Sequence, residues 1–317
     1  MKLHTNIQDF NELIRLTATY FKILPEFIEK DYWITFILNN LSKSSHANSV
    51  VFKGGTSLSK GYRIINRFSE DIDIALLDEK LTGSALKTKI RKIEKDITAD
   101  LTEIEELGVT SKGSVYRKSL FQYPSDINSR FVTNVQKRII VEINSFANPY
   151  PFVKKEIISF VAEFLKANNQ TEVIQEYGLQ QFSLNILDKR RTMLEKLVSL
   201  IRFSFSENPS RELAKKIRHF YDLYYLANDE ECAKYLQSSE FQKDLSELLI
   251  HDQQEFDEPQ GWQTKTVKNS PLITDFQYLW TNLRSTYQNE LKPLVFSEIP
   301  NEKLIEEAFL KIIKKTI

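Results

Sequence analysis

The sequence predicts an α+β protein in which a mixed sheet with flanking helices is followed by a mainly helical domain. Before residue 150, four short segments rich in β-branched residues lie between helical patterns, as expected for helices packed around one sheet. From about residue 155 onward, nearly every segment has the 3.6-residue periodicity of an amphipathic helix. We therefore expect a first domain over residues 1–150 and a second over residues 151–317.

The first five predicted elements surround a glycine-rich turn. Residues 6–42 read as two helices, the second with Pro25 near its start. "SVVFKGG" predicts a buried strand that ends at the glycines, and "TSLSKGYRIIN" predicts a short helix that Thr56 can cap. "DIDIALL" has the alternation of a second strand.

The remaining elements follow in the same way. We expect a long helix over residues 84–106 and two strands at "SVYRKSLFQYP" and "KRIIVEINSF", with a further strand at "QFSLNIL". "NNQTEVIQEYG" and "HDQQEFDEPQGWQ" resemble loops. The other helices are predicted at residues 156–167, 189–205, 210–227, 232–249, 272–288 and 302–315.

The composition excludes several classes of protein. Lys+Arg and Asp+Glu balance at 43 each, so no net charge attracts the chain to nucleic acid or a membrane, although a local groove can still be basic. One cysteine, Cys232, excludes an internal disulfide, and with four scattered histidines it argues against a zinc site. The N-terminal segment lacks the apolar core of a signal peptide, and no run approaches the ~20 apolar residues of a spanning helix. We expect a cytoplasmic protein with no membrane partner.

Two close carboxylates are the first candidate site. Asp71 and Asp73 project from one face of a strand, about 6–7 Å apart, while Ile72 and Ile74 face the core. Such carboxylates raise each other's pKa unless a cation lies between them, and Mg²⁺ prefers this kind of oxygen ligand. An isolated D-x-D is more often the acidic solvent face of an edge strand, so the motif requires support from elsewhere.

The turn upstream supplies that support. After Gly54 and Gly55, the predicted helix start at Thr56 and Ser57 offers backbone N–H groups and hydroxyls that bind phosphate well. The turn alone would also be explained by a backbone with positive φ, and it matches neither the Walker pattern nor G-x-G-x-x-G. Combined with D-x-D, it indicates a nucleotide site with cations nearby, namely Lys53, Lys60, Arg63 and Arg67.

These residues resemble a known superfamily. A strand, Gly-Gly and then D-x-D on the next strand is similar to the signature of the polymerase-β-like nucleotidyltransferases, and "FKGGTSLSK…RFSEDIDIAL" resembles the AbiEii/AbiGii toxin family, which includes MenT-type enzymes. "EKDYWITFIL", "DKRRTMLEKLVSL" and "IRHFYDLYYL" resemble further family helices, so the likeness extends over about residues 25–230. The fifteen residues between Gly55 and Asp71 exceed the spacing of most superfamily members.

The resemblance implies an activity and its partners. It implies a toxin of an abortive-infection or toxin–antitoxin system that uses Mg²⁺ or Mn²⁺ to transfer NMP from an NTP to an acceptor hydroxyl, with release of pyrophosphate. By analogy the acceptor is RNA, such as a tRNA 3′ end, and the cognate antitoxin is a partner. The second domain is then expected to complete the active site and to contact RNA through "KKIR" at 215–218 and the C-terminal "IIKKTI".

The resemblance also implies roles for residues outside the turn. Glu142, the one acid in "RIIVEINSF", becomes the third carboxylate, either a metal ligand or the base that deprotonates the acceptor. Lys196 is expected to contact the phosphates, and Asp222 to orient Lys196 or the nucleoside. The predicted nucleotide-binding set is Gly54, Gly55, Thr56, Ser57, Lys60, Ser69 and Arg218, with His219 a weaker candidate.

Two further expectations remain open at this point. Ser69 lies two residues before Asp71, so its phosphorylation would place negative charge against the carboxylates and act as a switch. The same fold can also modify a small molecule or a protein, or bind a nucleotide without catalysis. The retained Asp71, Asp73 and Glu142 argue against the non-catalytic alternative.

Overall fold

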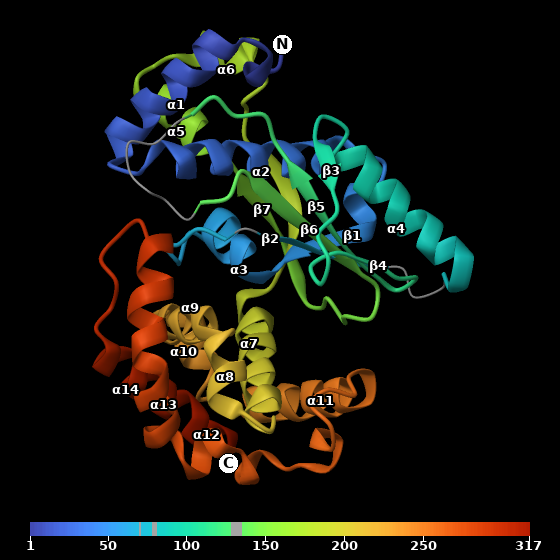
Figure 1. The fold of residues 1–317 in the computed structure, drawn as a ribbon, viewed down its shortest axis with the longest axis vertical. Coiled ribbons are helices and arrows are strands. Elements are labelled where there is room, and N and C mark those ends of the chain that lie inside the picture. Colours follow the sequence, from blue (N-terminus) through green and yellow to red (C-terminus); the bar gives the residue numbers. More distant parts are fainter. Residues whose placement is uncertain (70, 78–80, 128–134) are drawn as a thin grey trace. The chain divides into compact units, whose positions relative to one another are not determined.

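The computed structural model describes residues 1–69, 71–77, 81–127 and 135–317, which form two compact units. The first unit comprises Met1–Tyr62 and Phe68–Leu187, and the second comprises Arg63–Arg67 and Asp188–Ile317 (Figure 1). The division therefore falls at Leu187 and not near residue 150. The physical reason is that the two strands after residue 150 hydrogen-bond into the sheet of the first unit.

The first unit is built on a mixed sheet. Its strand order is β3-β5-β6-β2-β1-β8-β7, and β4 pairs with β5 outside this path. β2 runs parallel to β6 and antiparallel to β1, while β1 runs parallel to β8. The strands are β1 (Val50–Lys53), β2 (Asp71–Leu76), β3 (Thr102–Ile104), β4 (Ser111–Lys112), β5 (Tyr116–Gln122), β6 (Arg138–Asn144), β7 (Phe152–Ile157) and β8 (Phe182–Leu187).

Alternation along the central strands separates the core from the polar face. Ile72, Ile74, Val141 and Ile143 are fully buried, whereas Asp71 and Asp73, which alternate with the isoleucines of β2, are partly exposed. This period of two is what predicted β2 and β6 from the sequence, and both strands are confirmed.

Helices surround this sheet. Helix α2 is the most buried of them and contacts α1, α4, α5 and β8. The helical segments of the first unit are α1 (Ile7–Phe21), α2 (Pro25–Lys43), α3 (Gly54–Ser57), the one-turn π-helix η3 (Leu58–Tyr62), α4 (Gly83–Ile97), α5 (Phe160–Ala167) and α6 (Thr171–Glu176).

Three predictions for this unit were wrong in their boundaries. The helix expected over residues 84–106 ends at Ile97, because Thr98 turns its hydroxyl back onto the Glu94 carbonyl and the chain continues into β3. The helix expected from residue 156 begins only after Ser159, whose side chain caps α5, and β7 precedes it. The segment "NNQTEVIQEYG" contains α6 instead of forming a loop only.

The second unit is helical, as predicted. The interior is aromatic: Phe220, Phe276, Trp280 and Phe309 are buried and contact one another. Its helices are α7 (Lys189–Ser204), α8 (Pro209–Ala214), α9 (Ile217–Asn228), α10 (Glu230–Tyr235), α11 (Ser239–Glu255), α12 (Pro271–Thr274), α13 (Phe276–Thr286) and α14 (Glu302–Ile313). In the part of the chain that the structure describes, no helix has the length and apolar character needed to span a bilayer.

Candidate functional site

A row of four charged residues crosses the sheet of the first unit. The β pairing places Lys53 opposite Asp73, Asp73 opposite Glu142, and Glu142 opposite Lys118. Residues in cross-strand register project from the same face of a sheet, so the row reads cation, anion, anion, cation over β1, β2, β6 and β5. Asp71 lies on the same face of β2, two residues from Asp73.

The turn after β1 is fitted to one of these carboxylates. Gly54 has φ +77°, and a Cβ placed on it would lie 2.0 Å from Oδ2 of Asp73. Only glycine leaves room for this approach and adopts this backbone without strain. The sequence therefore needs a glycine here for two separate reasons, and the result is a carboxylate set directly against the start of α3.

The hydroxyls that follow the turn hold the local backbone together. Thr56 donates from Oγ1 to the carbonyl oxygen of Asp71 at 2.5 Å, and Ser57 donates to the carbonyl of Gly54 at 2.8 Å. Thr56 lies inside α3 and does not cap it, because the helix begins two residues earlier at Gly54. The Thr56 hydroxyl thus ties α3 to the start of β2, and the Ser57 hydroxyl closes the turn of α3 itself.

Glu142 has a partner for each carboxylate oxygen. Lys118 lies 2.8 Å from Oε1, and the Tyr116 hydroxyl donates to Oε2 at 2.9 Å. Burial by itself would lower the pKa of Lys118, but the hydrogen bond and charge of Glu142, with Asp71 and Asp73, outweigh it and raise that pKa. Burial and the same carboxylates raise the pKa of Tyr116, so both groups keep their protons at neutral pH.

The donor set fits a hard divalent cation at the two aspartates. Asp71 and Asp73 offer carboxylate oxygens from neighbouring positions on one strand face, which is the chemistry that Mg²⁺ or Mn²⁺ prefers. Among the described residues, however, no three His, Cys, Asp or Glu side chains converge closely enough to bind one ion. Glu142 is directed to Lys118 and Tyr116, which accounts for its absence from such a group.

Two other predicted residues of the first unit are engaged or buried. Lys60 pairs with Asp31 at 2.6 Å and donates to the carbonyl of Ile158, so its ammonium links η3 to α2 and to the approach of α5. Ser69 is only 7% exposed. Its phosphorylation stays a prediction.

The second unit contains a buried charge cluster around Asp222. Arg67 donates from Nε and Nη2 to the two carboxylate oxygens, each at 2.6 Å, and Lys196 lies 2.7 Å from Oδ2. Asp222 is 0% exposed and the two cations are nearly as buried. Burial opposes ionisation of Asp222, but the charges and hydrogen bonds of Arg67 and Lys196 prevail and hold its pKa below the usual range.

The structure thus brings Lys196 and Asp222 into direct contact, as the orienting role expected for Asp222 requires. Arg218 lies on α9, four residues before Asp222 and half-buried. His219 has a buried Nδ1, and burial together with the charges of Lys196 and Lys216 moves its pKa well below the ordinary histidine value. The imidazole is therefore neutral at pH 7.

Sequence reasoning missed three residues at these places. Tyr116 and Lys118 alternate with buried Arg117 on β5, and this alternation indicates that the two side chains share one face of the strand. The local sequence does not show that Glu142 lies opposite Lys118. Arg67 was counted only as a nearby cation. Its partner Asp222 is 155 positions away along the chain, so no local pattern connects them.

Comparison with known proteins identifies the family. The sequence profile described as "Nucleotidyl transferase AbiEii toxin, Type IV TA system" matches residues 37–312. The chain belongs to the AbiEii nucleotidyltransferase toxin family. The match spans both units, so the family assignment covers the charged row on the sheet as well as the Asp222 cluster.

A structural likeness supports the AbiEii fold. MenT4, a nucleotidyltransferase toxin from Mycobacterium tuberculosis H37Rv, superposes with a TM-score of 0.50 at 15% sequence identity, over 94% of this chain and 98% of that one. No curated protein matches the AbiEii sequence described here. The predicted nucleotidyltransferase fold is confirmed, and the protein is a nucleotidyltransferase toxin of a type IV toxin–antitoxin system, with an NTP as substrate and an antitoxin as partner.

Proposed function

We propose that this AbiEii toxin is a divalent-cation-dependent enzyme that transfers a nucleoside monophosphate from an NTP to a hydroxyl of an RNA acceptor and releases pyrophosphate. The observation that supports this most directly is the placement of Asp73 against Gly54, with Asp71 on the same strand face. A tRNA 3′ end is the acceptor that the family resemblance suggests.

The first unit supplies the proposed metal and triphosphate contacts. Asp71 and Asp73 would hold Mg²⁺ or Mn²⁺, which when bound neutralises phosphate charge and makes the acceptor hydroxyl a better nucleophile. The backbone N–H groups at Gly54 and Gly55 would meet the triphosphate, since the hydroxyls of Thr56 and Ser57 already bond to backbone. Glu142 would serve as third ligand or as the base that accepts the acceptor proton.

The second unit supplies the proposed cationic residue. We assign Lys196 to the nucleotide phosphates, where an ammonium stabilises the charge that develops on transfer. Asp222 would hold Lys196 in place, and the two-point contact of Asp222 with Arg67 would in turn fix the carboxylate. Arg218 and His219 are secondary candidates on the same helix.

The test is transfer of label from each α-³²P-labelled NTP to total RNA in the presence of Mg²⁺ or Mn²⁺. Wild type should label a discrete RNA species, and Asp71→Asn/Asp73→Asn should abolish labelling while remaining folded by circular dichroism. Asp257→Asn removes an exposed aspartate of the second unit and should label RNA as wild type does. Aspartate-dependent label on protein or on a small molecule, with none on RNA, would refute the RNA acceptor. Absence of any aspartate-dependent label would refute the proposed chemistry.

A further inference from the structure

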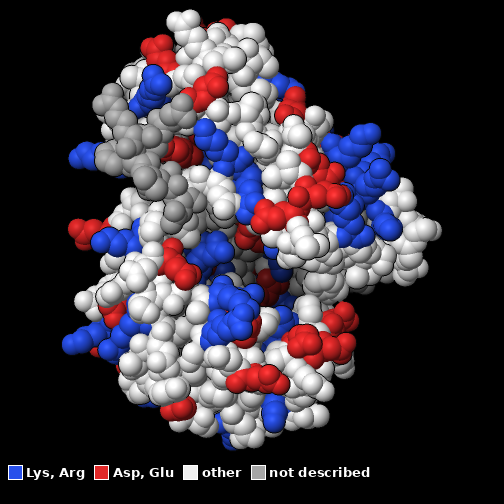
Figure 2. All heavy atoms as spheres, in the orientation of Figure 1, with Lys and Arg blue, Asp and Glu red and all other residues white. Residues whose placement is uncertain are grey.

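Helix α4 carries an excess of positive charge on its outer surface. We define the α4 basic face as Lys87, Lys89, Arg91, Lys92 and Lys95. The same helix contains two acids, and one of them, Glu94, is buried and paired with Arg117. Figure 2 shows the resulting cluster of blue side chains over α4.

This surface differs from three helical segments of the second unit. Lysines on α8, α10 and α11 have acidic partners one turn away, at Glu212, Glu230 and Glu247. Within the described part of the chain, no carboxylate forms an ion pair with four cations of the α4 basic face, namely Lys87, Arg91, Lys92 and Lys95. Like charges at i, i+4 repel, so the row at 87, 91 and 95 costs stability unless an anion binds there.

A groove beside α4 extends this preference for anions. It has a volume of about 860 Å³ and lies along the ends of α2 and α4. Three of its four acids pair with lysine or arginine: Glu94 with Arg117, Asp100 with Lys2, and Glu103 with Lys112. The fourth, Asp96, pairs with His46, which is charged only when protonated. The cations Lys43, Arg91 and Lys95 of the groove have no carboxylate partner among the described residues. The charge left for a ligand is therefore positive.

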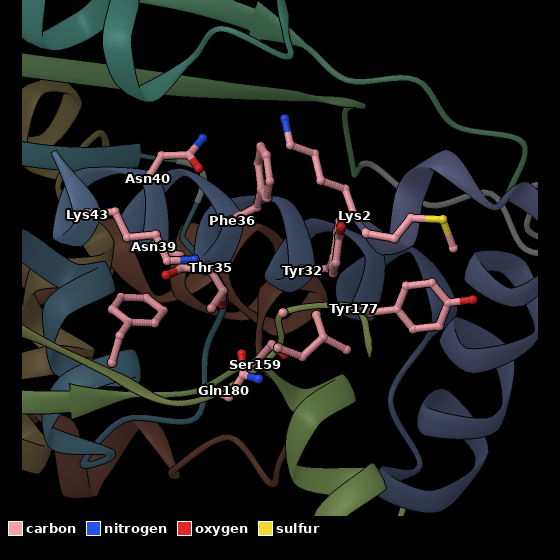
Figure 3. A pocket seen from close by; sticks show the side chains of 14 residues that line it. Lys2, Tyr32, Thr35, Phe36, Asn39, Asn40, Lys43, Ser159, Tyr177 and Gln180 are labelled. Carbon is pink, nitrogen blue, oxygen red and sulfur yellow. The ribbon is translucent and has the colours of Figure 1, made fainter. Parts of the chain in front are cut away.

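The groove adjoins a smaller cavity of about 150 Å³, because Lys2, Asn40 and Lys43 line both. No described Asp or Glu lines the cavity, whose walls offer aromatic rings and amides (Figure 3): Phe36, Tyr177, Phe182, Asn39, Asn40 and Gln180. Thr35 also lines it, and this side chain is only 8% exposed with an Oγ1 that has no hydrogen-bond partner. That hydroxyl is buried and does not open onto the cavity, so the exposed amide of Gln180 is the polar group that a ligand can reach there.

We propose that this groove and cavity bind single-stranded RNA, with phosphates along Lys43 and the α4 basic face and one unpaired base in the cavity. Unstacked RNA bases are typically recognised by aromatic rings and side-chain amides, and the backbone by a groove of cations. An acidic protein would meet the cations but leave the base-sized cavity without a role. The inference rests on the proposed RNA acceptor and assigns part of its binding to the first unit, instead of to "KKIR" and the C-terminal lysines. Arg117 and Phe121 of the groove alternate with Lys118 on β5, so the groove lies on the sheet face opposite the carboxylate row and would hold RNA away from the reacting hydroxyl.

The phosphate contacts are tested by anisotropy of a fluorescein-labelled single-stranded 12-mer RNA, with Mg²⁺ and without NTP. Lys87→Glu/Arg91→Glu/Lys95→Glu should weaken binding at least tenfold and reduce the slope of log K against log salt by about 2, at roughly 0.7 per contact. The matched variant Lys215→Glu/Lys314→Glu/Lys315→Glu makes the same change of charge in the second unit and should bind as wild type. If only this matched variant weakens binding, or if neither does, the assignment to α4 is refuted.

The base contact is tested with Gln180→Met, which removes the amide and keeps the length of the side chain. RNA affinity should fall severalfold with an unchanged salt slope, while the melting temperature stays the same because Gln180 is exposed. Unchanged RNA affinity would refute the cavity as a base site. These binding assays are repeated on Asp71→Asn/Asp73→Asn, so that RNA binding without transfer separates failure of the chemistry from failure of this surface.

Discussion

The carboxylate of Asp73 occupies the space that a side chain at Gly54 would need. Its Oδ2 lies 2.0 Å from the position of a Cβ on Gly54, and its Cγ lies 2.9 Å away. No rotation of a methyl group relieves such an overlap, so the carboxylate itself has to move if residue 54 gains a side chain. The glycine turn and the proposed metal ligand Asp73 are therefore parts of one arrangement.

Gly54→Ala should consequently abolish divalent-cation binding as well as transfer. The left-handed backbone at φ +77° costs about 1–2 kcal/mol of stability for alanine, and the clash with Asp73 adds displacement of the ligand. Mn²⁺ binding is measured by calorimetry and stability by urea unfolding. Gly108→Ala is the control, because Gly108 has φ +79° and nothing within 4 Å of its Cβ position. This control should lose stability but retain Mn²⁺ binding, and a Gly54→Ala protein that binds Mn²⁺ normally would contradict the arrangement.

Lys118→Met should raise the affinity for Mn²⁺ by roughly tenfold, or about 1.4 kcal/mol. The change removes the cation that neutralises Glu142 at 2.8 Å and leaves more negative charge beside Asp73. Calorimetric titration measures it, with Lys112→Met on the neighbouring strand β4 as the matched control. If Glu142 is a latent third ligand, Lys118→Met/Glu142→Gln will lose the gain. A gain that survives in the double variant would identify Glu142 as something other than a ligand.

Asp222→Asn should lower the free energy of unfolding by about 3–5 kcal/mol at pH 7, because the charges of Arg67 and Lys196 are left buried without a carboxylate. The folded-state pKa of Asp222 is depressed, so its stabilisation is present above about pH 4 and is lost as the pH falls further. Chemical unfolding from pH 7 to pH 3 should therefore show a shallower acid-dependent loss for the variant. Asp257→Asn should follow wild type throughout. An equal acid slope in Asp222→Asn and wild type would argue against a depressed pKa.

Glu29 on α2 should make stability depend on pH in the opposite direction. Burial raises its pKa to about 7, although hydrogen bonding from Ser125 and the charge of Lys137 oppose the shift. The folded state therefore holds a proton that the unfolded state releases near pH 4.3, and stability falls as the pH rises from about 4.3 to 7. Glu29→Gln should remove this fall and be more stable than wild type at pH 8, as measured by urea unfolding. Glu12→Gln, on the exposed side of α1, should not differ from wild type.

Local pattern predicted the elements whose side chains alternate or repeat regularly. The alternation in "DIDIALL" and "RIIVEINSF" gave β2 and β6, and Pro25 gave the start of α2. The pattern failed for β7, where "FVKKEI" is polar on much of its length because it pairs with β8 alone at the edge of the sheet. Edge position is a property of the assembled sheet and leaves little trace in six residues.

The sequence predicted the part of the candidate site whose residues lie close together along the chain. Asp71, Asp73 and the glycine turn lie within 20 residues, so their chemistry can be read together. The partners Lys118 and Arg67 could not be found this way, because strand register and tertiary packing bring them to Glu142 and Asp222. The residues that neutralise a buried or crowded charge are those that sequence alone identifies least.

The short segment Arg63–Arg67 makes the two units inseparable by a single cut. The chain leaves the first unit after Tyr62, contributes Arg67 to the second, and returns at Phe68. A fragment that stops at Leu187 would carry the guanidinium of Arg67 without its carboxylate, and the complementary fragment would carry Asp222 without that guanidinium. Neither fragment therefore contains the complete Arg67–Asp222 ion pair. A shortened version of the enzyme has to keep Arg67 and Asp222 in one polypeptide.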